Sequence, residues 1–165
     1  GLAGGALLAV GGVGLGLRGT ALVEPSGPLR VLTPTQFAVV HALADTCITV
    51  GQGAPSPAEL GVADGVDALL AGMHPADQAE VGQALLLLES ALAGFVLGGR
   101  TQTFTAMGPA DRARVLEGWR HSRITLLRTA YRGMVGLVLA VYWADPRSYA
   151  VSGYPGPRDW SGAVP

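Results

Sequence analysis

Apolar side chains recur every three or four residues from residue 33 onward, which is the spacing of one face of an α-helix. The first segment with this pattern opens at Thr33, which is predicted as the N-cap, with Pro34 at the first helical position. We expect this helix to extend to about residue 50. Its apolar stripe consists of Phe37, Val40, Ala44 and Ile48.

Four further helices are predicted, over about residues 63–73, 74–97, 109–119 and 121–143. Proline and glycine mark their ends: His74-Pro75 and Gly108-Pro109 open two of them, Gly98-Gly99 closes one, and Asp145-Pro146 closes the last. The final helix carries the longest apolar stripe, made of Ile124, Leu127, Tyr131, Met134, Val135, Val138 and Tyr142.

No segment alternates between apolar and polar residues as a strand would, so little strand is expected. The pattern predicts an all-α protein, an irregular helical bundle of four to six helices with an N-terminal apolar helix and an extended C-terminal tail. The predicted divisions are a signal-like or anchor segment over residues 1–22, a linker over 23–32, the bundle over 33–146 and an irregular tail over 147–165.

Residues 1–17 contain no charged side chain and seven glycines. As a helix this segment would be about 25 Å long, slightly short of a lipid hydrocarbon core. Its modest hydrophobicity is typical of a twin-arginine export signal, whose arginine pair would have to precede Gly1. The segment is expected to be a retained signal that serves as an anchor, with a glycine-rich core segment as the alternative. The glycines spaced for close helix packing are Gly1, Gly5, Gly12 and Gly16.

The chain of 165 residues has room for one domain with a core, and its 14% charged residues and mean hydropathy of +0.38 argue against disorder. Its net charge is -1, but the charges are unevenly distributed. Residues 1–99 hold 2 arginines and 8 carboxylates, whereas residues 100–165 hold 9 arginines and 4 carboxylates. This near-neutral balance does not favour nucleic-acid binding.

The sequence lacks the residues that several kinds of catalytic or binding site require. The single cysteine, Cys47, excludes an intrachain disulfide and any paired-cysteine metal or redox motif, and we expect it to be a small buried apolar residue. With no lysine there is no phosphate-binding P-loop, and neither a metal-binding HExxH nor a GxSxG nucleophile motif occurs. The carboxylates look like helix-start or solvated residues; they are Asp64, Asp67, Asp77, Glu80 and Glu89.

The three histidines are His41, His74 and His121. His41 lies within the first helix, where a partly buried, hydrogen-bonded histidine is the usual reason for its presence. His74 precedes a proline and is interpreted as a helix-start residue. Haem ligation by two of these histidines remains an open alternative.

Arginines and aromatic residues concentrate in the C-terminal part of the chain. The arginines of this cluster either pair with carboxylates or water, or contact a partner protein. The aromatic residues either cover the bundle itself or dock into a larger subunit. The arginines are Arg112, Arg114, Arg120, Arg123, Arg128 and Arg132, and the aromatic residues are Trp119, Tyr131, Tyr142, Trp143, Tyr149, Tyr154 and Trp160.

Four blocks of the sequence resemble the gluconate 2-dehydrogenase subunit 3 family. They are Leu32-Thr-Pro-Thr-Gln-Phe37 with His41-Ala-Leu-Ala-Asp-Thr46, Gly108-Pro-Ala-Asp-Arg-Ala-Arg-Val-Leu-Glu-Gly-Trp119 with Ser122 and Arg128, Tyr142-Trp143-Ala-Asp-Pro146, and Gly153-Tyr-Pro-Gly-Pro157. Together these blocks extend from residue 32 to residue 157, about three quarters of the chain.

The resemblance implies a non-catalytic small subunit of an extracytoplasmic, membrane-associated dehydrogenase. The catalytic partner would be a large FAD-dependent subunit of the glucose-methanol-choline type, often with a multihaem cytochrome c, so FAD and c-type haem belong to partner subunits. The small subunit would carry the export signal, stabilise its partner, and hold it at the periplasmic face of the inner membrane. Its expected core or interface anchors are Trp119, Arg123, Arg128, Tyr142, Trp143, Tyr154 and Trp160.

Two other functions remain open. The chain could be a packing subunit of another respiratory or photosynthetic membrane assembly that uses its glycine-rich segment in lipid. It could also be a small b-type haem or metal-binding bundle that uses its histidines.

Overall fold

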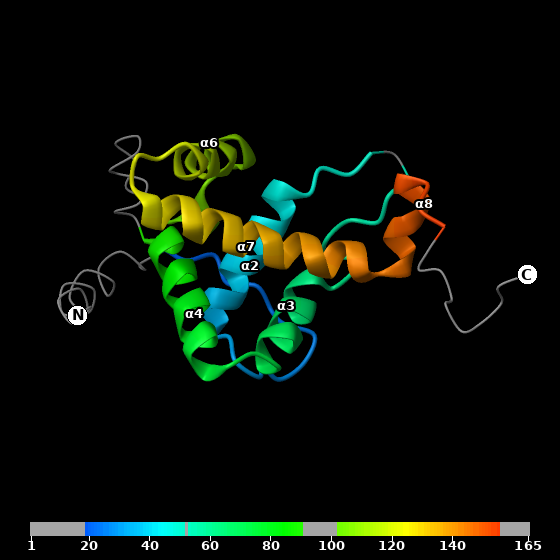
Figure 1. The fold of residues 1–165 in the computed structure, drawn as a ribbon, viewed down its shortest axis with the longest axis horizontal. Helices are drawn as coiled ribbons and strands as arrows, with labels where there is room; N and C mark the ends of the chain where they lie inside the picture. Colours follow the sequence, from blue (N-terminus) through cyan, green and yellow to red (C-terminus); the bar gives the residue numbers. More distant parts are fainter. Residues whose placement is uncertain (1–18, 52, 91–101, 156–165) are drawn as a thin grey trace, which may run out of the picture.

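A computed structural model describes residues 19–51, 53–90 and 102–155. This part of the chain is helical and contains no strand, which confirms the all-α class. Figure 1 shows α7 running across the other helices along the long axis of the molecule. The main helices are α2 (Pro34–Cys47), α3 (Val62–Ala71), α4 (Pro75–Glu89), α6 (Pro109–Arg120) and α7 (Thr125–Ala144); the short ones are η1 (Phe104–Ala106), η2 (Pro146–Ser148) and α8 (Tyr149–Ser152).

The helix starts are set by local residues, as the sequence predicts. In α2 the Thr33 side chain accepts from the Gln36 backbone N–H, and the Gln36 side chain accepts from the Thr33 N–H, so two otherwise unpaired donors are satisfied. The His74 ring caps α4 by accepting from the Ala76 N–H at 3.2 Å. Both helices, like α6, begin with proline at the first position, where no N–H is needed.

Three predicted boundaries need correction or fall outside the described residues. The long helix begins at Thr125 rather than at His121, because α6 continues to Arg120 and a turn follows, in which the Ile124 N–H donates to Ser122 Oγ. The tail is not wholly irregular, since residues 146–152 form η2 and α8. The helix predicted to reach residue 97 instead ends at Glu89, where Ser90 leaves the helical conformation as the C-cap of α4; residues 91–97 lie outside the described residues.

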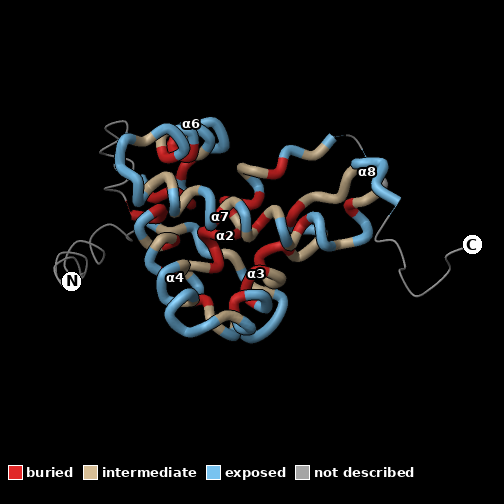
Figure 2. The backbone as a smooth tube through the Cα atoms, viewed as in Figure 1, coloured by how far each residue is buried: buried red, intermediate tan, exposed pale blue. Residues whose placement is uncertain are grey.

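The core forms around α2, which contacts α3, α4, α6 and α7. Its residues from Phe37 to Val40 and from Ala42 to Ala44 are all buried. In Figure 2 the buried stretches concentrate around α2 and the inward side of α7, while α4 and α6 expose their outer sides. The half-buried Cys47 lies against this core, where burial raises the pKa of its thiol to about 11. Its thiol is therefore protonated at neutral pH.

Gly65 allows α3 and α7 to approach each other. A Cβ at this position would overlap Val141 Cγ1, which the α3–α7 contact brings against the glycine. The close approach positions the C-terminal half of α7 over the bundle.

We expect Gly65→Ala to destabilise the fold by about 1–3 kcal/mol, because the added methyl group overpacks this contact. Chemical denaturation measures the effect. Val141→Ala should offset part of it, so the double variant should lose less stability than the two single losses combined. If the two losses simply add, the overlap with Val141 is not the cause.

Most of the predicted anchor segment, residues 1–22, lies outside the residues that the structure describes. Residues 1–18, which include Gly1, Gly5, Gly12 and Gly16, lie outside the described residues, as does Trp160. Among the helices that the structure describes, none is long and apolar enough to cross a membrane.

Candidate docking surface

Two of the predicted anchors, Trp119 and Tyr142, are core residues. Trp119 is fully buried, and its indole Nε1 has no hydrogen-bond partner among the described residues. The Tyr142 hydroxyl donates to the Pro55 carbonyl oxygen at 2.9 Å, which ties α7 to the loop after α2. Burial raises the pKa of Tyr142. Of the two roles predicted for these residues, core or interface, the structure assigns the core role to both within the single chain.

Four arginines of the predicted cluster are bound within their own part of the chain. Arg112 donates to the carbonyl oxygens of Phe104 and Thr105 and lies over the Phe104 ring. Arg128 donates to the Ser122 carbonyl oxygen at 2.6 Å, so it fastens the turn before α7. Two pairs lie one helical turn apart on α6, Arg114 with Asp111 and Arg120 with Glu117. The partners of these four arginines are therefore local.

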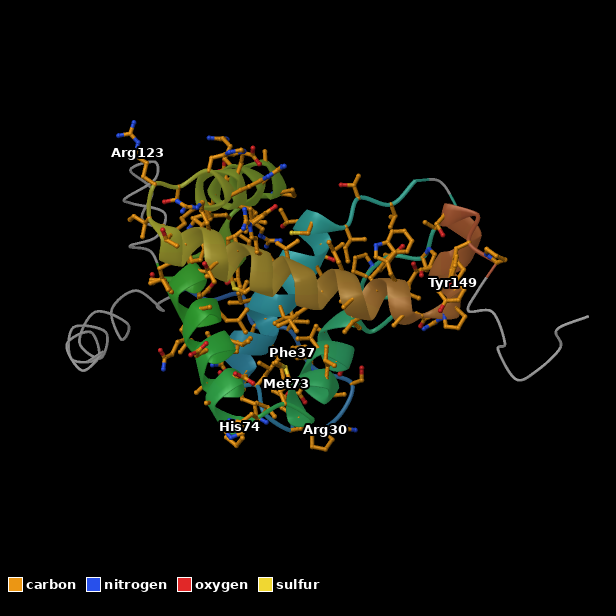
Figure 3. The ribbon with its side chains drawn as sticks, in the orientation of Figure 1. Arg30, Phe37, Met73, His74, Arg123 and Tyr149 are labelled. Atoms are coloured by element: carbon orange, nitrogen blue, oxygen red, sulfur yellow. The ribbon has the colours of Figure 1, made fainter. Side chains whose placement is uncertain are left out.

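The turn between α6 and α7 forms the first end of a candidate docking surface. Arg123 is exposed there, and Arg132 is exposed about two turns along α7; neither has an ion-pair partner within the described residues. Beside them Ile124 is 55% and Leu126 65% exposed. Figure 3 shows Arg123 pointing away from the helices at this end. Exposed apolar residues next to arginines are typical of protein interfaces.

The second end lies where α7 meets α8. Trp143 is 44% exposed and packs edge-on against Tyr142, with ring centroids 5.1 Å apart. Tyr154 is 50% exposed and packs in the same way against Tyr149, which Figure 3 places at this end of the molecule. The exposed members of the predicted interface set, Arg123, Trp143 and Tyr154, thus lie near the two ends of α7, whereas Trp119 and Tyr142 are buried.

A salt-bridged turn supports this second end. The Arg147 guanidinium donates to both carboxylate oxygens of Asp145, and these hydrogen bonds lower the pKa of that carboxyl. Arg147 also donates to the Glu59 carbonyl oxygen at 3.4 Å. The segment carrying Tyr149 and Tyr154 is therefore fastened to the loop before α3.

The histidines have separate local partners. His41 Nδ1 lies 3.3 Å from Asp45 on the next turn of α2, and His121 Nε2 lies 2.8 Å from Glu117 on α6. His41 and Asp45 line a hollow of about 130 Å³ together with Glu24. No group of three or more metal-ligating side chains meets anywhere in the part of the chain that the structure describes.

Asp67 was expected to be a helix-start or solvated residue, and this expectation is wrong. It is 4% exposed, and its carboxylate accepts three backbone N–H groups from residues 30–32, at 2.7, 3.0 and 2.8 Å. Burial by itself would raise the pKa of Asp67, but these hydrogen bonds and the nearby Arg30 guanidinium outweigh it, and the pKa lies below its usual value. A signal existed in the sequence, because Asp67 occupies the apolar stripe of Ala63, Val66 and Leu70.

Glu89 was also expected to be a helix-start or solvated residue, but it is fully buried at the end of α4. Its carboxylate accepts from the Thr105 backbone N–H at 2.9 Å and from the Thr105 hydroxyl at 2.6 Å. The same hydroxyl oxygen accepts from the Ala21 N–H at 2.9 Å. Glu89 therefore anchors η1 and, through Thr105, the segment that enters the bundle from the N-terminal side. Its position four residues after the buried Leu85 could have indicated burial.

These features define an all-α bundle with internal carboxylate anchors and a candidate docking surface at the two ends of α7. Comparisons with protein-family models, with curated proteins and with solved structures found no match to this chain.

Proposed function

We propose that this chain is a non-catalytic accessory subunit of an extracytoplasmic, flavin-dependent sugar or alcohol dehydrogenase. In this proposal a large FAD-dependent subunit of the glucose-methanol-choline type performs the oxidation, and a multihaem cytochrome c can accept the electrons. The chain stabilises its partner, accompanies it through the twin-arginine export route, and tethers it to the membrane through residues 1–22.

The observation that carries this proposal is the surface left uncovered at the two ends of α7. Arg123, Ile124 and Leu126 are exposed at one end, and Trp143 and Tyr154 at the other. A large apolar side chain gains most from burial when it enters a partner's pocket, and a guanidinium without an internal ion pair is free to meet a carboxylate there. This combination supports a role in binding another protein.

The family resemblance supports the same proposal through its local structure. The block around Thr33 forms the capping box of α2, and the block from Gly108 to Trp119 forms α6 and ends on a buried tryptophan. The block from Tyr142 to Pro146 ends α7 and starts η2. These three blocks thus each have a definite structural task in the bundle.

Affinity purification of the full chain from its native host tests the proposal. We expect a stoichiometric partner that shows flavin absorbance and oxidises a sugar or alcohol with an artificial electron acceptor, whereas the isolated chain has no such activity. A stable partner assembly without flavin would overturn the dehydrogenase assignment and favour another membrane assembly. Oxidation of the substrate by the isolated chain would overturn the accessory role.

Arg123→Glu should reduce recovery of the flavoprotein roughly tenfold or more, because charge reversal places a carboxylate against an acidic partner surface. Arg123→Ala should give a smaller loss in the same direction. Arg30→Ala is the matched control, since Figure 3 shows Arg30 at a different edge of the molecule. Quantitative mass spectrometry of the purified complex measures the recovery. Equal recovery from all three variants would remove Arg123 from the interface.

A further inference from the structure

The outward side of α7 carries a continuous exposed seam, which we call the α7 seam. Its members are separated alternately by three and four residues, the spacing that keeps side chains on one face of a helix and that lets two helices pack at about 20°. Every member is exposed. The seam spans about 26 Å. It consists of Leu126, Thr129, Gly133, Gly136, Ala140 and Trp143.

The two glycines at the centre of the α7 seam have no packing reason within the described chain. A Cβ added at Gly133 or at Gly136 would have no other atom within 4 Å. Glycine inside a helix is less stable than alanine, because it loses more conformational entropy on folding. Gly65 offers a contrast, because there Val141 occupies the space that a side chain would need. The central glycines instead leave room for a second helix to approach the α7 backbone closely.

The order of side-chain sizes along the α7 seam is self-complementary. It reads large, small, glycine, glycine, small, large from Leu126 to Trp143. A two-fold axis between residues 134 and 135 would place Leu126 of one copy against Trp143 of the other, and Gly133 against Gly136. A surface that matches itself in this way is the requirement for a two-fold symmetric dimer.

The charges on α7 select the antiparallel arrangement. Arg128 and Arg132 lie in its first half and Arg123 just precedes it, whereas residues 133–144 contain no charged side chain and are followed by the ion pair of Asp145 with Arg147. Parallel pairing would bring the arginines of two copies together. Antiparallel pairing separates them and places Arg132 of each copy beside the uncharged second half of the partner's α7.

We propose that the α7 seam is the interface of a homodimer in which α7 packs antiparallel against α7 of a second copy of this chain. This goes beyond the proposed function: it assigns Leu126 and Trp143 to the second copy and leaves Arg123, Ile124 and Tyr154 to the dehydrogenase. A single pair of helices makes a small interface, so the dimer is expected to dissociate on dilution.

Sedimentation equilibrium of the full-length chain over a range of concentrations tests the dimer. We expect a monomer–dimer equilibrium in which Gly136→Leu and Trp143→Ala each raise the dissociation constant roughly tenfold or more. Leucine at position 136 meets open space in the single chain, so the helical circular dichroism and thermal unfolding of the monomer should be retained. Ala113→Leu, which adds the same side chain to the exposed side of α6, is the matched control.

Disulfide cross-linking tests the orientation. In a Cys47→Ser background, chains carrying Gly133→Cys mixed with chains carrying Gly136→Cys should form mixed disulfides in excess over either homodisulfide. A monomer at every concentration would overturn the proposal, and so would a dimer that is insensitive to both seam variants. Binding of the dehydrogenase that requires the seam while the chain stays monomeric would assign the face to that partner instead. The sedimentation and cross-linking results do not depend on whether the flavoprotein is found.

Discussion

Asp67→Ala should lower the free energy of unfolding by about 3–5 kcal/mol, which is a large part of the stability of a domain this size. The buried carboxylate accepts three backbone N–H groups from residues 30–32. Alanine would leave these donors without acceptors, at least one of them in a buried position. Urea denaturation followed by circular dichroism measures the loss.

Asp64→Ala is the matched control, because Asp64 lies on the same helix and also holds the incoming chain. Its carboxylate accepts from the Ser26 N–H and hydroxyl, but these bonds are exposed. We expect a loss of about 1 kcal/mol for this variant. Equal losses in the two variants would mean that burial of Asp67 adds nothing to its contribution.

The contribution of Asp67 should also depend on pH with a definite sign. The pKa of Asp67 is lowered in the folded chain, whereas the unfolded value is about 3.9. The stabilisation is therefore complete well above pH 3.9, and it is lost as the pH falls from there through the folded pKa. Stability measured against pH should show a smaller acid decline in Asp67→Asn than in the native chain. Parallel acid declines would contradict this account.

Glu89→Ala should destabilise the fold by about 3–5 kcal/mol and also release the N-terminal entry segment. The fully buried carboxylate holds Thr105 through two hydrogen bonds, and the Thr105 hydroxyl holds Ala21. Hydrogen exchange should therefore accelerate at the Ala21 and Thr105 amides more than at the buried amides of α2. Denaturation and exchange measured by NMR give the two readouts.

Two substitutions at Thr105 distinguish the loss of its hydroxyl hydrogen bonds from a general loss of packing. Thr105→Val keeps the shape but removes the hydroxyl, so we expect a loss of about 1–3 kcal/mol and faster exchange at Ala21. Thr105→Ser keeps the hydroxyl and should retain slow exchange there. If valine and serine give the same exchange rate at Ala21, the hydroxyl does not hold the entry segment.

Much of the helical framework could be predicted because its signals are local. Thr33 with Gln36, His74 with Pro75, and Gly108 with Pro109 each act within a few residues to start a helix. The predicted start of α7 is wrong because the apolar stripe already includes residue 124. The turn that separates α6 from α7 is held by hydrogen bonds of Ser122 and Arg128. The spacing of apolar residues along the sequence does not indicate such a turn.

The candidate docking surface could be predicted only in part. The sequence singled out the arginines and aromatic residues near α7, but it did not distinguish the buried Tyr142 from its exposed neighbour Trp143. One residue along a helix changes direction by about 100°, so the position of the neighbouring helices decides which of the two is covered. The sequence also gave no reason to expect the exposed α7 seam with its two central glycines.

The sequence by itself determined the all-α class, most helix starts and the concentration of arginines and aromatic residues toward the C-terminus, because these follow from nearest neighbours and composition. Only the tertiary structure decided that Asp67 and Glu89 are internal anchors. Their donors lie 35 to 37 and 16 residues away in the chain. A carboxylate can be buried only where such distant donors converge on it, and that convergence depends on how the helices pack.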